Sequence, residues 1–124
     1  MANPNIVNVT SIYGNTTYLT PSTTGATTWT ALTPAVGTVN RVTSITASNV
    51  TGSNVAVTVS VNSATGGGGT AYRLAYQIAV PANASLIIVD KTTALYIGEA
   101  QSVVVTVGTG SAIELVSSYE AITS

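Results

Sequence analysis

The 124-residue sequence contains no cysteine and no histidine, and it has only three basic and four acidic residues. Disulfide bonds are therefore excluded, as are thiol nucleophiles and the side chain that most often exchanges protons near neutral pH. The charged fraction is 6 %, against about 25 % in ordinary soluble domains. These absences argue against an enzyme, and a net charge of −1 provides no basic surface for nucleic acid.

The few acidic residues do not form a catalytic or metal-binding pattern. Glu114 and Glu120 share one face of a predicted strand but lie roughly 20 Å apart. Asp90 and Lys91 follow an apolar strand, where a solvated turn is expected and an intersubunit salt bridge is the functional alternative. No Asp-x-Asp-x-Asp calcium loop occurs. We predict no catalytic residue, no cofactor and no metal.

Long hydrophobic runs are also missing. The start of the sequence, Met-Ala-Asn-Pro-Asn-Ile, lacks the basic and apolar regions of a secretion signal. Apolar runs such as residues 86–89 and 103–105 are too short to cross a bilayer. The sequence therefore predicts a protein that is neither exported through the Sec pathway nor inserted in a membrane.

Strand signals run from one end of the chain to the other, because β-branched residues alternate with Thr, Ser and Asn and no stretch keeps a helical period. The clearest strand is 54–62, in which valines alternate with smaller side chains. Tyr76 alternates with Leu74 and Ile78 and is predicted to face the core. The other predicted strands are 6–12, 38–48, 71–80, 85–89, 94–97, 102–107 and 112–122, with a ninth candidate at 27–32.

Turn residues separate these strands at spacings near ten residues, which favours an all-β fold. We predict an antiparallel two-sheet β-sandwich of about eight strands, with either immunoglobulin-like or jelly-roll-like strand order. Four consecutive glycines at 66–69 are not followed by the lysine and helix that a phosphate-binding loop requires. This run is predicted to be a mobile hairpin tip.

The N-terminal third is the least regular part of the chain. Residues 1–34 are predicted to form an extended arm with the first strand or strands and to serve as a docking segment, while residues 35–124 form the β-sandwich domain. Aromatic side chains with a polar tip suit interfaces, so Tyr13, Tyr18 and Trp29 are candidate docking anchors. The alternative is that these three side chains cover an open end of the sandwich.

The only two arginines, Arg41 and Arg73, each interrupt a predicted strand. Either guanidinium could pair with the carboxylate of Glu114 or Glu120. Pairing across strands of one subunit is favoured over pairing between subunits. These four residues and the three aromatic residues complete the set of predicted interface residues.

The order of the strand and turn segments between 39 and 122 resembles a known module. The segments are 40–49 (NRVTSITASN), 55–61 (VAVTVSV), 78–89 (IAVPANASLIIV), 95–100 (LYIGEA), 103–107 (VVVTV) and 118–120 (SYE). In this order they resemble a small β-sandwich module of structural proteins from tailed bacteriophages, including those that infect cyanobacteria. That module has a Glu-Gly-Asp turn where this chain has Gly98-Glu-Ala-Gln101, so a charge-dependent role of the turn does not carry over.

The resemblance implies a virion structural protein and transfers no catalytic residue. Because a nearly uncharged, Thr-rich β domain can be buried against a capsid without desolvating many charges, we predict a capsid decoration (cement) protein. It would bridge major capsid subunits on the outer capsid surface after synthesis in the host cytoplasm. Its expected partners are the major capsid protein and further copies of itself, as a homotrimer or alternatively a dimer, with no nucleic acid and no membrane.

Two other functions fit the same sequence. A neck, tail or fibre adaptor would occur at few copies in each virion and would contact a ring or a fibre. A carbohydrate-binding module would stack sugars on Trp29 and on tyrosine faces, although the calcium ligands that many such sites use are scarce.

Overall fold

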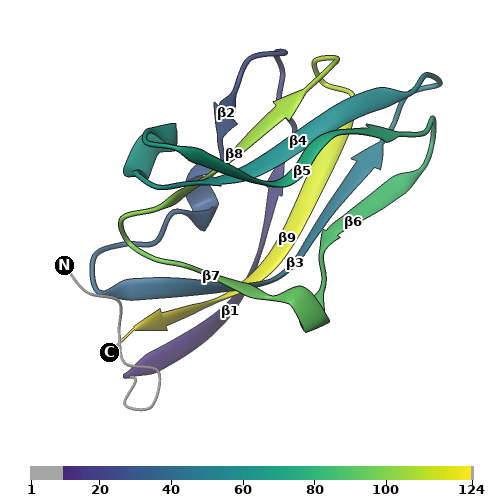
Figure 1. Cartoon of the computed structure of the whole chain (residues 1–124). Coiled ribbons are helices and arrows are strands. Elements are labelled where there is room, and N and C mark those ends of the chain that lie inside the picture. Colours follow the sequence, from purple (N-terminus) through teal and green to yellow (C-terminus); the bar gives the residue numbers. More distant parts are fainter. Residues whose placement is uncertain (1–9, 124) are drawn as a thin grey trace.

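Two antiparallel β-sheets packed face to face make up the computed structural model, which describes residues 10–123 (Figure 1). The first sheet has the strand order β1-β9-β3-β6, and β7 pairs with β3 beside β6. Its strands are β1 (Ser11–Leu19), β3 (Thr38–Asn49), β6 (Ser85–Val89), β7 (Leu95–Ile97) and β9 (Ile113–Thr123). The predicted all-β sandwich is confirmed.

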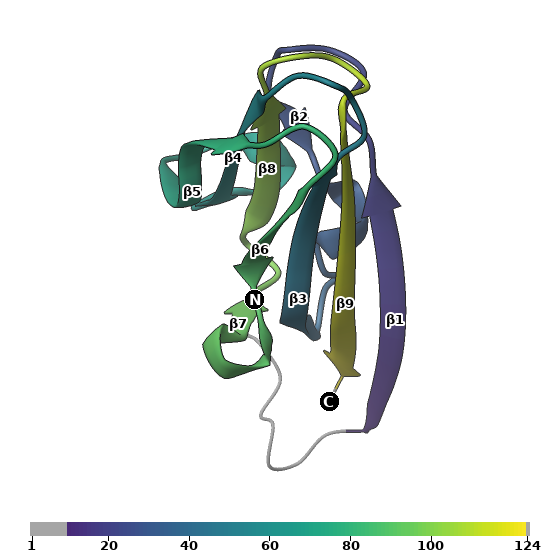
Figure 2. The ribbon, with the colours of Figure 1, turned by 90° about the vertical axis from the view of Figure 1, so that its right-hand side faces the viewer.

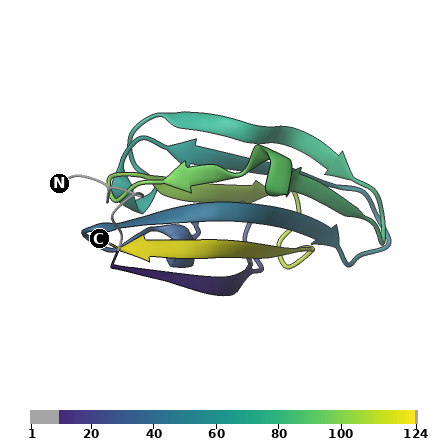
Figure 3. The same cartoon turned by 90° about the horizontal axis from the view of Figure 1, so that it is seen from below.

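The second sheet has the strand order β2-β8-β4-β5. Its strands are β2 (Thr27–Thr28), β4 (Val55–Asn62), β5 (Ala71–Val80) and β8 (Ser102–Val107). Three single-turn 3-10 helices lie in connections between strands. η1 (Thr30–Leu32) lies between β2 and β3, in different sheets, whereas η2 (Thr65–Gly67) lies between β4 and β5 and η3 (Lys91–Thr93) between β6 and β7. Figure 3 shows the two layers edge-on, and Figure 2 shows β1 at the margin of the first sheet beside β9.

The core lies between the sheets and follows from the alternation in the sequence. Val55, Val57 and Val59 of β4 point inward, and the intervening Ala56 and Thr58 point outward. The main buried cluster joins side chains from both sheets, including Val42, Ile45, Ala47, Val80, Val103, Val105, Ile113 and Leu115. The inward faces of β3, β4, β8 and β9 therefore supply most of the burial that holds the sandwich together.

Trp29 lies in this core with 1 % of its surface exposed, held between β2 and η1. The prediction of an exposed docking anchor or sugar-stacking platform is wrong for this residue. Its position fits the alternative that N-terminal aromatic residues cover an end of the sandwich. Residues 10–34, predicted to lie in an arm with the first strands, supply β1, β2 and η1 to the two sheets.

Most predicted strands agree with the structure, and β5, β6 and β8 match to the residue. At the N-terminus the predicted strand 6–12 does not end where expected, because the strand in the described residues is Ser11–Leu19. Residues 1–9 of the predicted strand and docking segment lie outside the described residues. Gly14 and Asn15 have low strand propensity and hide the strand in the sequence, whereas pairing with β9 imposes it.

The glycine run at 66–69 lies in the β4–β5 hairpin connection, as predicted, but the connection folds back onto the sheet. The Asn62 side-chain amide donates to the Gly67 carbonyl at 2.9 Å, and the Gly67 N–H donates to Ser102 Oγ at 3.0 Å. Gly67 has φ +80°, and a Cβ atom there would lie 2.6 Å from Thr28 Oγ1. Hydrogen bonds and a steric requirement for glycine therefore fix this connection to the outside of the second sheet.

Candidate interaction surfaces

The first candidate surface is strand β1, which forms one margin of the first sheet. It pairs with β9 in an unbroken register from Ser11 opposite Thr123 to Leu19 opposite Leu115. Among residues 10–123 no strand pairs with its other side, which we call the free edge. The strand is exposed on both faces, since alternate side chains point to opposite faces and almost all of them are accessible.

The exposed residues of β1 include three large ones, of which two were predicted as interface residues. Tyr13 and Tyr18 are 66 % and 73 % exposed, and Ile12 is 53 % exposed. Ile12 and Tyr18 share one face of the strand, and Tyr13 lies on the other. The predicted anchors thus lie on a regular strand rather than on an irregular arm.

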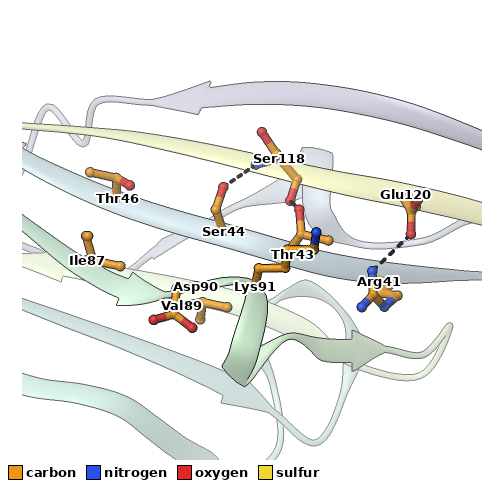
Figure 4. Close-up of a pocket in the computed structure, with 10 residues that line it drawn as sticks. All are labelled: Arg41, Thr43, Ser44, Thr46, Ile87, Val89, Asp90, Lys91, Ser118 and Glu120. Carbon is orange, nitrogen blue, oxygen red and sulfur yellow. Dashed lines mark hydrogen bonds and ion pairs between the residues drawn. The ribbon is translucent and has the colours of Figure 1, made fainter.

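Hydrogen bonds of β9 establish which backbone groups of β1 face the free edge. The Ser118 N–H donates to Ser44 Oγ at 3.2 Å, and its carbonyl accepts from Thr43 Oγ1 at 3.0 Å, so both groups point toward β3 (Figure 4). Since backbone groups alternate along a strand, odd-numbered β9 residues point toward β1. The Thr123 carbonyl does so, because it accepts from the Thr10 N–H. Even-numbered residues of β1 therefore direct their N–H and C=O groups to the free edge.

The second candidate surface is strand β5, which forms a margin of the second sheet. Its pairing with β4 is interrupted by register shifts. One of them accompanies Gln77, whose φ is +49° and whose N–H donates to Thr58 Oγ1 at 2.9 Å. The Arg73 guanidinium lies over the Tyr76 ring, 5.0 Å from its centroid. β5 is therefore an edge strand with a bulge and a charged side chain.

Four large apolar side chains are exposed along β5, and none of them was predicted as an interface residue. They are Tyr72, Leu74, Tyr76 and Ile78, with exposed fractions between 40 % and 65 %. The prediction that Tyr76 faces the core is wrong, because this residue is 57 % exposed. Alternation along a strand does not reveal whether that strand lies at the margin of its sheet. The apolar row of β5 was hidden for this reason.

The third candidate surface is a shallow groove on the outer face of the first sheet (Figure 4). Arg41 of β3 and Glu120 of β9 are directly opposite each other, and their side chains form a salt bridge of 3.2 Å. This confirms the predicted cross-strand pair within one chain. Both side chains are partly exposed, so the pair contributes about 1 kcal/mol or less to stability. The rest of the lining is Thr43, Ser44, Thr46, Ile87, Val89, Asp90, Lys91 and Ser118.

Asp90 and Lys91 form a turn at one margin of this groove. The Asp90 carboxylate caps η3, accepting from Thr92 Oγ1 at 2.6 Å and from the backbone N–H groups of Thr92 and Thr93. These hydrogen bonds, above all the one from the Thr92 hydroxyl, hold the pKa of Asp90 below its usual range. The predicted turn is confirmed, and the carboxylate is engaged within it.

The seven predicted interface residues do not form one site. Arg41 and Glu120 meet in the outer groove, and Glu114 lies further along β9, opposite Ser48. Arg73 stacks on an aromatic ring instead of pairing with either predicted glutamate. Tyr13 and Tyr18 share β1.

Within residues 10–123, no group of three or more acidic side chains is arranged to hold a metal ion. In the same part of the chain, no helix has the length and apolar character needed to span a membrane.

Comparisons with known proteins show the fold only. No protein-family model and no curated protein matches the chain. A protein of the Bacillus endospore appendages, which form disulfide-linked pili, is similar over 92 % of this chain and 88 % of its own, with a TM-score of 0.50 and 16 % identity. A structure of the virus-like particle of extra small virus from the giant freshwater prawn Macrobrachium rosenbergii covers 98 % of this chain and 86 % of its own, with a TM-score of 0.43 and 15 % identity. The chain is thus similar to the appendage protein in its β-sandwich fold over most of its length.

Proposed function

We propose that this chain is a non-enzymatic structural protein of a virion, and specifically a capsid decoration protein that binds the major capsid protein on the outer capsid surface. The observation that carries the proposal is the apolar row of Tyr72, Leu74, Tyr76 and Ile78 on β5. The resemblance of residues 39–122 to a bacteriophage β-sandwich module supports the viral context.

The β5 row has the composition of a protein-binding surface. Tyrosine is enriched at interfaces because it buries a large ring while its hydroxyl keeps a hydrogen bond. Two tyrosines and two aliphatic residues lie along this margin over about 20 Å, from Tyr72 to Ile78. Contact with another protein would remove this apolar surface from water and stabilise the complex.

The scarcity of charge favours burial of the surrounding surface as well. The sequence carries only seven charged residues, and Arg41 and Glu120 already pair with each other. Thr and Ser hydroxyls can hydrogen-bond across an interface, so burying them costs less than desolvating unpaired charges. A large part of the surface of this molecule can therefore be buried in a protein interface with a small desolvation penalty.

The β-sandwich fold is compatible with assembly, since the Bacillus appendage protein of similar fold forms pili. Those pili are disulfide-linked, whereas this chain has no cysteine and cannot form disulfide links to its neighbours. On a capsid, such contacts repeat at every symmetry-related site. A modest interface at each site then adds up to a large stabilisation of the shell.

The copy number in purified particles tests the proposed location. Quantitative mass spectrometry against the major capsid protein would give hundreds of copies for a protein that decorates a symmetric lattice. A few to about twenty copies would contradict decoration and indicate a neck, tail or fibre adaptor at a local symmetry axis. Absence from the particle would overturn the virion proposal.

Substitutions in the β5 row test the proposed surface. The double variant Tyr72→Ala/Tyr76→Ala should bind undecorated capsids at least about tenfold more weakly, because buried aromatic anchors dominate interface energies. Tyr96→Ala is the matched control, since Tyr96 is 48 % exposed on β7, away from the row. Equal binding by wild type and the double variant would exclude β5 as the contact.

A further inference from the structure

We propose that β1 is the interface between two copies of this chain, and that the two β1 strands pair antiparallel across a two-fold axis through Asn15. The inference depends on the geometry of β1 and stands whether or not the protein belongs to a capsid. It assigns a role to a margin strand that is exposed on both faces and, unlike β5, has an unbroken register and no charged residue.

The free edge of β1 has none of the features that normally prevent strands from pairing between molecules. Its sequence, SIYGNTTYL, contains no charged residue and no proline. Its register with β9 is continuous over all nine residues, so no bulge twists the strand away. Edge strands that stay unpaired usually carry a lysine, a proline or a bulge, or are very short. β1 is therefore an open template for another strand.

The alternation of backbone groups makes β1 complementary to itself. The free edge presents the N–H and C=O groups of even-numbered residues, as the hydrogen bonds of β9 establish. A two-fold axis through the odd-numbered Asn15 places Gly14 opposite Thr16 of the second copy, and both residues direct their groups to the shared edge. All nine residues of each strand then pair, with about eight backbone hydrogen bonds between the copies.

The side chains agree with the same register. Ile12 and Tyr18 lie three residues on either side of Asn15 and on one face of the strand. In the two-fold pair, Ile12 of each copy lies opposite Tyr18 of the other, so two exposed apolar residues cover each other twice. Tyr13 lies opposite Thr17, and no like charges meet. This reciprocal match favours a second copy of the chain as the occupant.

The pairing closes at two copies. An isologous contact uses the same strand on both partners, so no free β1 edge remains for a third copy. The first sheet would continue from one copy into the other through β9, β1, the second β1 and the second β9. A dimer is therefore expected where a trimer was the first prediction from the sequence.

Cysteine cross-linking of the purified full-length chain tests this register directly. The chain has no cysteine, so one substitution creates the only thiol. In Asn15→Cys, the two Cα atoms across the axis would be about 4.5 Å apart, as in any non-hydrogen-bonded antiparallel pair. This separation suits a disulfide. Mild oxidation should convert nearly all of this variant to a covalent dimer.

Tyr13→Cys is the matched control, because its exposed thiol would lie about 13 Å from its own copy across the axis. It should not cross-link alone, but it should cross-link when mixed with Thr17→Cys. Light scattering of the unmodified chain at micromolar concentration should give the mass of a dimer, whatever the behaviour of the variants. A monomer or trimer, or equal cross-linking of Tyr13→Cys and Asn15→Cys, would overturn the proposal.

These results do not depend on the proposed function. A dimer that fails to bind capsids would contradict decoration alone. A monomer that decorates capsids would contradict the β1 interface alone.

Discussion

The two sheets end in edge strands of similar length but different design. β5 carries a bulge at Gln77 and a charged Arg73, and its last residue, Val80, is fully buried in the core. β1 has a regular register, no charge and exposed side chains on both faces. The bulge and the charge oppose strand addition at β5, whereas nothing within β1 opposes it.

This difference assigns different contacts to the two edges. β5 offers apolar side chains along an interrupted backbone, which suits side-chain packing against a partner. β1 offers an uninterrupted row of backbone groups, which suits strand pairing. One small β-sandwich can thereby bind a second copy of itself and another protein at the same time, on opposite sheets.

The largest expected effect on the free energy of unfolding comes from a core residue, which lies at neither edge. It provides a reference for the smaller effects expected at the two edges. Trp29→Ala should lower the free energy of unfolding by about 3–5 kcal/mol, because it removes a fully buried indole from the core. Tyr72→Ala on the exposed β5 edge should change it by no more than about 0.5 kcal/mol. Urea denaturation measures both values. Equal effects would contradict the separation of core from edge.

A positive charge should break the β1 contact and spare β5. Asn15→Lys places two ammonium groups opposite each other across the axis, so the dimer Kd should rise about 100-fold, equivalent to about 2.7 kcal/mol. Leu74→Lys on β5 should leave the dimer Kd unchanged. Analytical ultracentrifugation measures both constants. Mixing Asn15→Lys with Asn15→Asp should restore dimers, and a failure of this pair would contradict the register.

A smaller effect should follow from the loss of the Arg73 contact on β5. Arg73→Ala removes the guanidinium from the Tyr76 ring and should lower the free energy of unfolding by about 0.5–1 kcal/mol, the usual value for an exposed cation–π contact. Arg73→Lys is the control, because it keeps the positive charge and should lose less stability. The urea midpoints of the two variants test whether the contact helps to hold the bulged edge.

The smallest effect concerns η3, which separates the short strands β6 and β7 at the other margin of the first sheet. Hydrogen bonds lower the pKa of Asp90 in the folded state, so its ionised form stabilises the fold at neutral pH. This contribution should be lost as the pH falls below about 4, where the carboxylate takes up a proton. Urea midpoints between neutral and acidic pH should fall less for Asp90→Asn than for wild type. Identical pH profiles would exclude this contribution.

The sequence predicts the fold well where the information is local. β5, β6 and β8 match their predicted bounds because β-branched alternation is bounded there by turn residues. Burial is predicted less well, since it depends on which strand becomes a margin of its sheet. Tyr76 was predicted to face the core but is exposed, because β5 is a margin strand.

The candidate surfaces were also harder to predict, because they depend on which strands pair with each other. The types of residue in the Arg41–Glu120 pair were predicted, but only the register of β3 and β9 brings these two side chains together. β1 is a strand because it pairs with β9 at the far end of the chain, and no local pattern around Gly14 and Asn15 reveals this. Its free edge is therefore visible only in the structure.

Residue-resolved amide hydrogen exchange by NMR tests the central claim, the pairing of β1 with β1, most directly. At high concentration of the wild-type chain, the Gly14 and Thr16 amides should be protected, because the second copy accepts their hydrogen bonds. They should exchange rapidly in Asn15→Lys, while the amides at the outer edge of β5 should exchange rapidly in both proteins. Rapid exchange of Gly14 and Thr16 in the concentrated wild-type chain would contradict the account.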